Sequence, residues 1–229
     1  MIHIYRTDKQ NQHKVEEIEK IENLCWIEMT NPTEEEIKEI ASKTKTDIHL
    51  LNKLLDDEEL PRVEIEGNST LIVVDTPYIT NNKYKHKYNT DPIGLILSDQ
   101  YFITISLREL GLFQDFKDGK IRDFDIKKKT KFVIQILLRI ASIYQKELKA
   151  INSDINNKEK TLYKSTHNQE LVGLLDIEKT LTYFTTSLKA NDVVLEKLSK
   201  GSLVTMYEDD IDLLEDAIIE NKQAIEMAN

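Results

Sequence analysis

The run Arg62-Val-Glu-Ile-Glu-Gly-Asn-Ser-Thr-Leu-Ile-Val-Val-Asp75 predicts two strands and, through them, the class of the fold. Two β-like runs flank Gly67-Asn68, and a Gly-Asn pair between such runs predicts a hairpin. Residues 93–97 and 101–105 repeat the arrangement across a short polar turn. Consecutive hairpins favour antiparallel pairing. The sequence therefore predicts a mixed, mainly antiparallel sheet.

Short elements upstream are expected to complete and cover this sheet. Thr33 and Glu36 have the spacing of a capping box, which predicts the start of a helix. Helices beside a sheet bury their apolar side against one of its faces. The predicted upstream elements are strands at residues 2–5 and 24–29 and helices at residues 33–43 and 47–55.

From about residue 125 the strand signals vanish and three helices are predicted. Thr166 with Gln169, and Thr205 with Glu208, have the spacing of helix caps. Helices approaching about 35 residues far exceed the usual length of about 11–12, which indicates a helical hairpin or an oligomeric coil. The expected parts are an α/β sheet subdomain at 1–124, a long helical hairpin at 125–200 and a last helix at 202–229.

Composition narrows the class of protein. The 229 residues are 40% hydrophobic and 31% charged, as in an ordered globular protein. The 31 basic and 41 acidic residues give a net charge of −10, which disfavours binding to nucleic acid and favours attraction of cations. A single Cys25 cannot form an internal disulfide, so a reducing, cytosolic setting is expected. No run of 18 apolar residues occurs, so the chain as given is expected to be soluble.

The last helix carries a seven-residue apolar repeat, and β-branched residues at that spacing favour a helix that coils around its neighbours. A second apolar strip indicates contact on two sides. An oligomeric coil and packing against the two preceding helices of the same chain are both compatible with this pattern. The repeat is Val204, Ile211, Ile218 and Ile225 with Tyr207, Leu214, Asn221 and Ala228, and the second strip is Leu213, Ala217, Ala224 and Met227.

The same helix is strongly acidic. Residues 202–229 hold eight Asp or Glu and one Lys, a net charge of −7. Asp209, Asp212, Asp216 and Glu220 recur at three- and four-residue spacing, where each like-charge pair costs roughly 0.2–0.5 kcal/mol. A divalent cation relieves this repulsion, and Mg²⁺ needs only one or two carboxylates. Asp212 and Asp216 are therefore candidate Mg²⁺ ligands, and a solvated acidic face is the alternative.

Two further charged runs have two interpretations each. Asp56-Asp57-Glu58-Glu59 follows a short predicted helix, where acidic groups oppose the helix macrodipole. Asp56 and Asp57 are therefore further candidate cation ligands, and a solvated turn is the alternative. Lys127-Lys128-Lys129, with Lys131, is either a solvated helix start or a docking surface for an acidic helix such as the last one.

Catalytic motifs are missing from the sequence. The five His residues do not occur at zinc-ligand spacing, and no nucleophile-elbow, P-loop or dinucleotide-binding pattern occurs. The sequence predicts no enzymatic activity.

Several stretches resemble the cytoplasmic domain of the CorA family of magnesium transporters. Pro61-Arg-Val-Glu64, preceded by residues 51–59 and followed by 70–74, resembles the start of that domain. Trp26-Ile-Glu28 and Pro32-Thr-Glu-Glu-Glu-Ile37 resemble the family's opening motifs. The ending, residues 216–229, looks like the long helix that leads into the family's first transmembrane span.

The resemblance implies a helix-covered mixed sheet, two long packed helices and a long C-terminal stalk helix at 202–229. It implies a homopentamer in the cell membrane, with this domain in the cytoplasm and five stalk helices around a central pore. In the family, Gly-Met-Asn follows the first span and selects hydrated Mg²⁺. Neither that tripeptide nor a span lies within these residues, so we expect the chain to be the part that precedes the membrane.

The resemblance also implies regulation by weakly bound Mg²⁺ between neighbouring cytoplasmic domains, with bound ions holding the pore closed. One family ligand lies on the stalk helix, and Asp216 matches it. The family's acidic pair before the proline is Asn52-Lys53 here, and a further acidic position aligns near Arg139. Asp56 or Asp57 replaces the missing pair if the short helix is shifted.

The sequence thus predicts the cytosolic ion-sensing and pore-lining domain of a divalent cation transporter or channel. The expected ion is Mg²⁺, with Co²⁺ or Ni²⁺ also passing, and the expected partners are copies of the same chain. A soluble coiled-coil scaffold without transport and a zinc transporter of the same superfamily are the alternatives.

Overall fold

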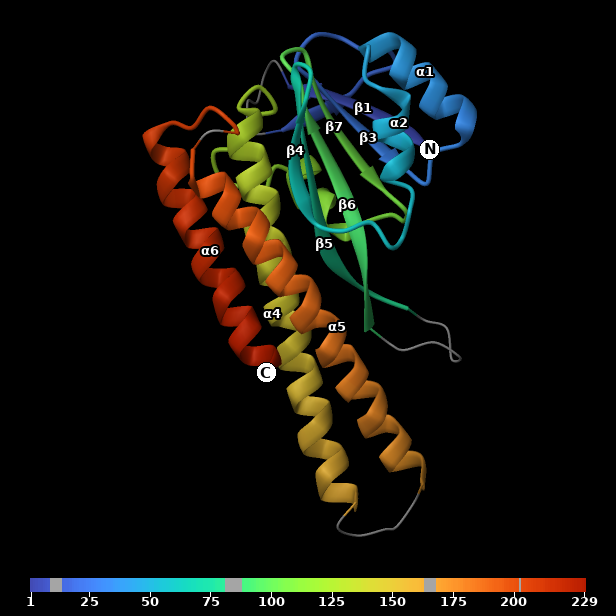
Figure 1. Ribbon diagram of the computed structural model, residues 1–229, viewed down its shortest axis with the longest axis vertical. Coiled ribbons are helices and arrows are strands. Elements are labelled where there is room, and N and C mark those ends of the chain that lie inside the picture. The colour runs from blue at the N-terminus through green and yellow to red at the C-terminus, as the bar shows by residue number, and fades with distance from the viewer. Residues whose placement is uncertain (9–13, 81–87, 163–167, 202) are drawn as a thin grey trace.

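The computed structural model describes residues 1–8, 14–80, 88–162, 168–201 and 203–229. In these residues a seven-stranded sheet has three long helices on one side and two short helices on the other (Figure 1). The predicted α+β class is confirmed. The strands are β1 (Ile2–Thr7), β2 (Val15–Glu17), β3 (Cys25–Thr30), β4 (Arg62–Glu66), β5 (Ser69–Ile79), β6 (Tyr88–Leu97) and β7 (Tyr101–Ser106). The helices are α1 (Glu34–Thr44), α2 (Ile48–Lys53), α3 (Gln114–Lys117), α4 (Lys129–Leu162), α5 (Asn168–Ser199) and α6 (Glu208–Ala228), with a 3₁₀ turn at Gly111–Phe113.

The strand order is β2-β1-β3-β7-β6-β5-β4. Both predicted hairpins form, β4 with β5 and β6 with β7. The pairing of β3 with β7 is parallel, and every other neighbouring pair is antiparallel. The sheet is therefore mixed and mainly antiparallel, as the two hairpin signals predict.

Local signals set the start of α1. The hydroxyl of Thr33 accepts the Glu36 N–H at 3.2 Å, and the Glu36 carboxylate accepts the Thr33 N–H at 2.8 Å. This is the predicted capping box, which satisfies two backbone donors that the helix itself leaves unpaired. Lys45, with a φ of 58°, ends the helix in the left-handed conformation.

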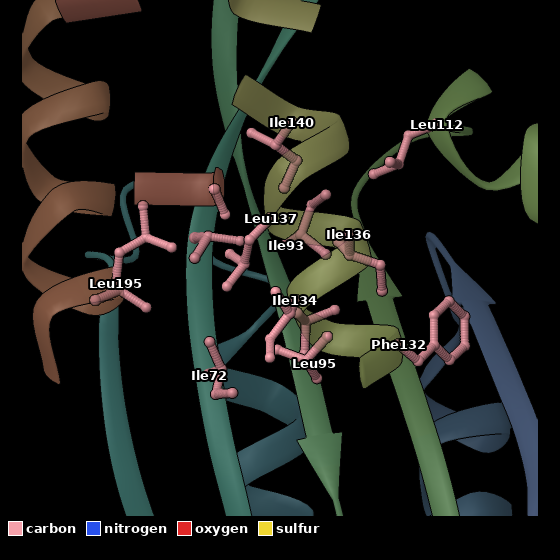
Figure 2. Close-up of a cluster of buried hydrophobic side chains, with 14 of the residues drawn as sticks. Ile72, Ile93, Leu95, Leu112, Phe132, Ile134, Ile136, Leu137, Ile140 and Leu195 are labelled. Atoms are coloured by element: carbon pink, nitrogen blue, oxygen red, sulfur yellow. The ribbon is translucent and has the colours of Figure 1, made fainter. Parts of the chain in front are cut away.

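The sheet has a separate apolar core on each face. Along β5, Leu71 and Val73 face the core under α1 and α2, and Ile72 and Val74 face the core under the long helices. Burial on both faces explains why this strand is one continuous apolar run. Figure 2 shows the second core, formed by Ile72, Ile93 and Leu95 of the sheet, Phe132, Ile134, Ile136, Leu137 and Ile140 of α4, Leu195 of α5, and Leu112.

The long helices differ from the sequence prediction mainly at their starts. Helix α4 begins at Lys129, not at residue 125, because the Asp125 carboxylate accepts the Lys127 N–H in a turn at 3.0 Å. The expected cap at Thr166 lies outside the described residues.

The expected cap of α6 at Thr205 is wrong. Helix α6 begins at Glu208, and the carboxylate of Asp210 accepts the backbone N–H of Tyr207 at 3.1 Å. The carbonyl of Thr205 instead accepts the Thr130 hydroxyl at 2.9 Å. This bond ties the segment before α6 to the start of α4.

Candidate functional site

Helix α6 packs along both α4 and α5 (Figure 1). The Asn221 amide donates to the carbonyl of Leu188 on α5 at 3.1 Å, and the Gln145 amide of α4 donates to the carbonyl of Glu220 at 2.9 Å. Packing within one chain therefore accounts for Leu214, Asn221 and Ala228 of the companion repeat position and for much of the second strip. The buried residues of α6 are Asp210, Leu214, Ala217, Asn221, Ala224 and Ala228.

The β-branched position of the repeat is only partly covered within one chain. Ile211 is 49% exposed, and the neighbouring Ile219 is 52% exposed. Ile218 and Ile225 are partly buried at the rim of the core. Helix α6 thus keeps an uncovered apolar strip beside its packed side.

The acidic row of α6 lies on its solvent side. Asp209, Asp212 and Asp216 are exposed, and among the described residues none of the three has a hydrogen-bond or ion-pair partner. Glu220 differs, because Gln145 Nε2 donates to its carboxylate at 2.6 Å. Asp212 and Asp216 are therefore free to bind a cation from outside the chain.

Asp56 and Asp57 lie in the turn after α2. The Asp56 carboxylate accepts the Glu58 N–H at 3.0 Å, and Glu59 pairs with Arg62. The turn thus uses part of the acidic run for its own stability. Both Asp56 and Asp57 remain exposed.

The two groups of candidate ligands lie on opposite sides of the sheet. Leu54, just before the acidic turn, is buried in the core that covers one face, and Leu214 of α6 is buried in the core on the other face. In the described ranges no group of three or more His, Cys, Asp or Glu side chains lies close enough to hold a metal ion. A cation shared by Asp216 with Asp56 or Asp57 therefore requires two copies of the chain.

Asn52, Lys53 and Arg139 occupy the positions that are acidic in the family. Asn52 and Lys53 are exposed on α2. Arg139 forms an ion pair with Asp115, so it connects α4 to α3. A carboxylate at position 139 would repel Asp115, so this position cannot supply an acidic ligand here.

Asp75 is a partly buried ionisable group that was not among the residues expected from the sequence. It lies on β5 opposite α5 and is partly buried. Burial raises the pKa of its carboxyl from 3.8 to about 6, the negative charge of Asp91 raises it further, and a hydrogen bond with Ser187 opposes both effects. An Asp that directly follows the apolar run 71–74 was the signal available in the sequence.

In the described part of the chain, no helix combines the length and the apolarity that a membrane crossing requires. This result covers α4 and α5, the two longest helices.

The fold is shared with solved structures of CorA and ZntB proteins. The soluble domain of CorA from Methanocaldococcus jannaschii superposes with a TM-score of 0.86 at 22% identity, covering 100% of this chain and 90% of that one. The complete CorA magnesium transporter from the same organism gives 0.86 at 21% identity, with 100% and 72% covered. The cytoplasmic domain of ZntB from Vibrio parahaemolyticus gives 0.68 at 10% identity, with 99% and 92% covered.

Sequence comparison leads to the same group of proteins. The cobalt/magnesium transport protein CorA of Methanocaldococcus jannaschii is 25% identical over 214 residues, which are 90% of this chain and 64% of the relative. The chain thus spans somewhat less than two thirds of the length of that relative. The profile of the family described as CorA-like Mg²⁺ transporter protein matches residues 22–229. This match shows that the chain belongs to the CorA-like Mg²⁺ transporter family.

Proposed function

We propose that this chain is the ion-sensing and pore-lining domain of a divalent cation transporter that carries Mg²⁺. One observation carries the proposal: helix α6 of a CorA-like chain presents both an uncovered apolar strip and a row of unpaired carboxylates. The apolar strip suits a neighbouring helix, and the carboxylates suit a hydrated cation.

Five copies around a central pore would give the apolar strip its partners. Ile211, together with Ile218 and Ile225, would then pack against α6 of the adjacent copies. In the proposed ring, the face that carries α2 in one copy would lie near α6 of the next. Asp56 or Asp57 of one copy and Asp216 or Asp212 of its neighbour would then hold a Mg²⁺ ion between them.

Such an ion would act as a sensor through a population shift. It binds the arrangement in which the carboxylates of two copies converge, so it favours the closed pore over arrangements in which the copies separate. Because Mg²⁺ keeps most of its water and takes one or two carboxylates, its binding is weak. A weak site loses its ion when cytosolic Mg²⁺ falls, and the copies are then free to move.

The donor set favours Mg²⁺ over Zn²⁺ as the sensed ion. The candidate ligands are carboxylates, which suit hard cations, whereas Zn²⁺ sites prefer His and Cys. The name of the archaeal relative joins cobalt with magnesium, so we extend the proposal to Co²⁺ as a transported ion. The similarity of fold to a ZntB domain keeps zinc as the competing cargo.

Two experiments test the transporter assignment. The native reading frame beyond the codon for Asn229 should encode two apolar stretches of about 20 residues each, with Gly-Met-Asn between them. The protein encoded by that frame should restore growth of cells that lack their own Mg²⁺ uptake. A stop codon directly after Asn229 would instead favour the scaffold interpretation, and uptake of Zn²⁺ without Mg²⁺ would favour the zinc alternative.

A further inference from the structure

A cavity of about 700 Å³ lies where the start of α4, the β6–β7 turn and the segment leading into α6 meet. Four ammonium groups from one five-residue run line it, those of Lys127, Lys128, Lys129 and Lys131. The lining also includes apolar surface from Leu203 and Val204, and the aromatic residue Tyr207, which is 73% exposed. The cavity thus combines positive charge with an accessible aromatic ring.

Three of the four ammonium groups are uncommitted. Among the described residues no carboxylate lies within ion-pair distance of Lys127, Lys128 or Lys131. Lys129 differs, because its ammonium donates to the carbonyls of Ser98 and Asp99 and so holds the β6–β7 turn. The free lysines surround the first turn of α4, where positive charge opposes the helix macrodipole. A bound anion would offset the repulsion among these lysines and the unfavourable interaction of their charge with the helix macrodipole.

The carboxylates of the cavity do not cancel this charge. Asp99, Asp209 and Asp210 also line it. Asp210 is 4% exposed and is engaged by the N–H of Tyr207, so its role is to cap α6. Four ammonium groups against these three carboxylates still leave a formal charge of +1 in the cavity, in a chain whose net charge is −10.

We propose that this cavity binds a nucleoside phosphate. The phosphates would lie against Lys127, Lys128 and Lys131, and the base would lie against the ring of Tyr207. Ligand sites of about 300–1,000 Å³ that combine apolar walls with a few charged groups suit molecules of this size, and aromatic rings stack on any base. A phosphate alone would leave the apolar wall unused.

A ligand in the cavity would affect the position of α6. The Thr130 hydroxyl donates to the Thr205 carbonyl at 2.9 Å, and the Thr70 hydroxyl donates to the Leu203 carbonyl at 3.2 Å. A ligand between these segments therefore contacts the connection that positions α6. The site is distinct from the acidic row at Asp212 and Asp216.

Calorimetric titration of the purified chain with ATP tests the proposal, with divalent cations removed by chelation so that the acidic sites stay empty. We expect one saturable site per chain. Lys128→Gln combined with Lys131→Gln should weaken binding at least about tenfold, because hydrogen bonds to charged groups are strong. Lys127→Gln alone should weaken it less. Lys149→Gln, an exposed lysine of the same helix away from the cavity, is the matched control and should bind ATP as the parent chain does.

Tyr207→Ala separates recognition of the base from recognition of phosphate. It should weaken ATP binding while leaving binding of inorganic tripolyphosphate unchanged, and adenosine alone should bind weakly to both proteins. Thermal melting of each variant verifies that it is folded. Absence of saturable ATP binding to the folded parent chain would overturn the proposal. Equal binding by the lysine variants and the control, or tripolyphosphate binding as tight as that of ATP, would do the same.

Discussion

The side-chain amide of Asn191 on α5 makes two hydrogen bonds to the backbone of Asp75 on β5. Its Nδ2 donates to the Asp75 carbonyl at 2.8 Å, and its Oδ1 accepts the Asp75 N–H at 2.8 Å. Pairing of β4 with β5 ends at Arg62 opposite Val73, so the backbone of Asp75 lies beyond the last strand partner on that side. Asn191 therefore takes the place of a strand residue and fixes α5 to the sheet.

Replacement of Asn191 by Ala should destabilise the chain. The substitution leaves the N–H and carbonyl of Asp75 without their partner, and an unsatisfied buried group costs about 1–3 kcal/mol. Urea unfolding should show a lower midpoint with an unchanged slope. Asn52→Ala, at an exposed position of α2, is the control. Equal midpoints for the two variants would show that the double hydrogen bond contributes nothing.

Stability should depend on the protonation of Asp75. The pKa of Asp75 is raised to about 6 in the folded chain, whereas an Asp in the unfolded chain has a pKa of about 3.9. The folded state therefore binds this proton more tightly than the unfolded state does. The resulting stabilisation is fully present below about pH 4 and is lost as the pH rises through about 6. Its size is at most about 3 kcal/mol, since one pKa unit corresponds to about 1.4 kcal/mol.

The measurement is the difference in unfolding free energy between the parent chain and Asp75→Asn at pH 4.5, 5.5, 6.5 and 7.5. The amide keeps the shape of the protonated acid without ionising, so the parent chain should lose stability relative to the variant as the pH rises. A difference between the two proteins that does not change with pH would contradict the raised pKa. Hydrogen bonds lower the pKa values of Glu36 and Asp118. Both groups are present in the parent chain and in the variant, so their contributions cancel in the difference.

Gly94 of β6 determines how closely α2 approaches the sheet. A Cβ atom at this position would clash with Cδ1, Cδ2 and Cγ of Leu54, whereas nothing lies within 4 Å of a Cβ atom at Gly111. Gly94→Ala should therefore destabilise the chain by about 1–3 kcal/mol, as overpacking does, and Gly111→Ala should not overpack its site. Thermal melting of the two variants measures the contrast. A Gly94→Ala variant as stable as Gly111→Ala would mean that Leu54 rearranges freely.

The two sides of α6 should respond differently to substitution. Leu214 is 2% exposed within the chain and Ile211 is 49% exposed. Leu214→Ala should cost about 2–5 kcal/mol of unfolding free energy, whereas Ile211→Ser should change it little and weaken self-association. Chemical unfolding and light scattering measure the two effects separately. Loss of monomer stability in Ile211→Ser without any change in association would contradict the assignment of the uncovered strip to a neighbouring copy.

Elements with a local signal were predictable from the sequence. The hairpin at Gly67 and the capping box of Thr33 depend on residues a few positions apart, and both formed as predicted. Strand β2 has only three residues and no periodic pattern, so it was missed. The start of β6 was missed because Pro92 is unfavourable in a strand interior. Pro92 is tolerated opposite Asp75, whose backbone groups turn toward Asn191 and need no donor from β6.

The candidate site was predictable only in part. The row that includes Asp212 and Asp216 follows from helical spacing, and both of these residues are exposed, whereas Glu220 of the same row is partly covered. The sheet separates this acidic row from Asp56. That separation depends on which helix covers which face of the sheet, and no local sequence pattern encodes this arrangement. The pairing of Asp75 with Asn191 joins residues 116 positions apart, so it too required the assembled structure.

The most direct test of the account measures thermal melting and molar mass of the chain with and without millimolar Mg²⁺, at matched ionic strength. Ligand at 100 times its dissociation constant adds about 2.7 kcal/mol of stability. We predict that Mg²⁺ raises the melting temperature and the assembled fraction of the parent chain and of Glu226→Gln, an exposed acidic control on the same helix. Asp216→Asn should lose most of both responses. Identical melting and mass with and without Mg²⁺, or a full response in Asp216→Asn, would contradict the proposed role of α6 in sensing the ion.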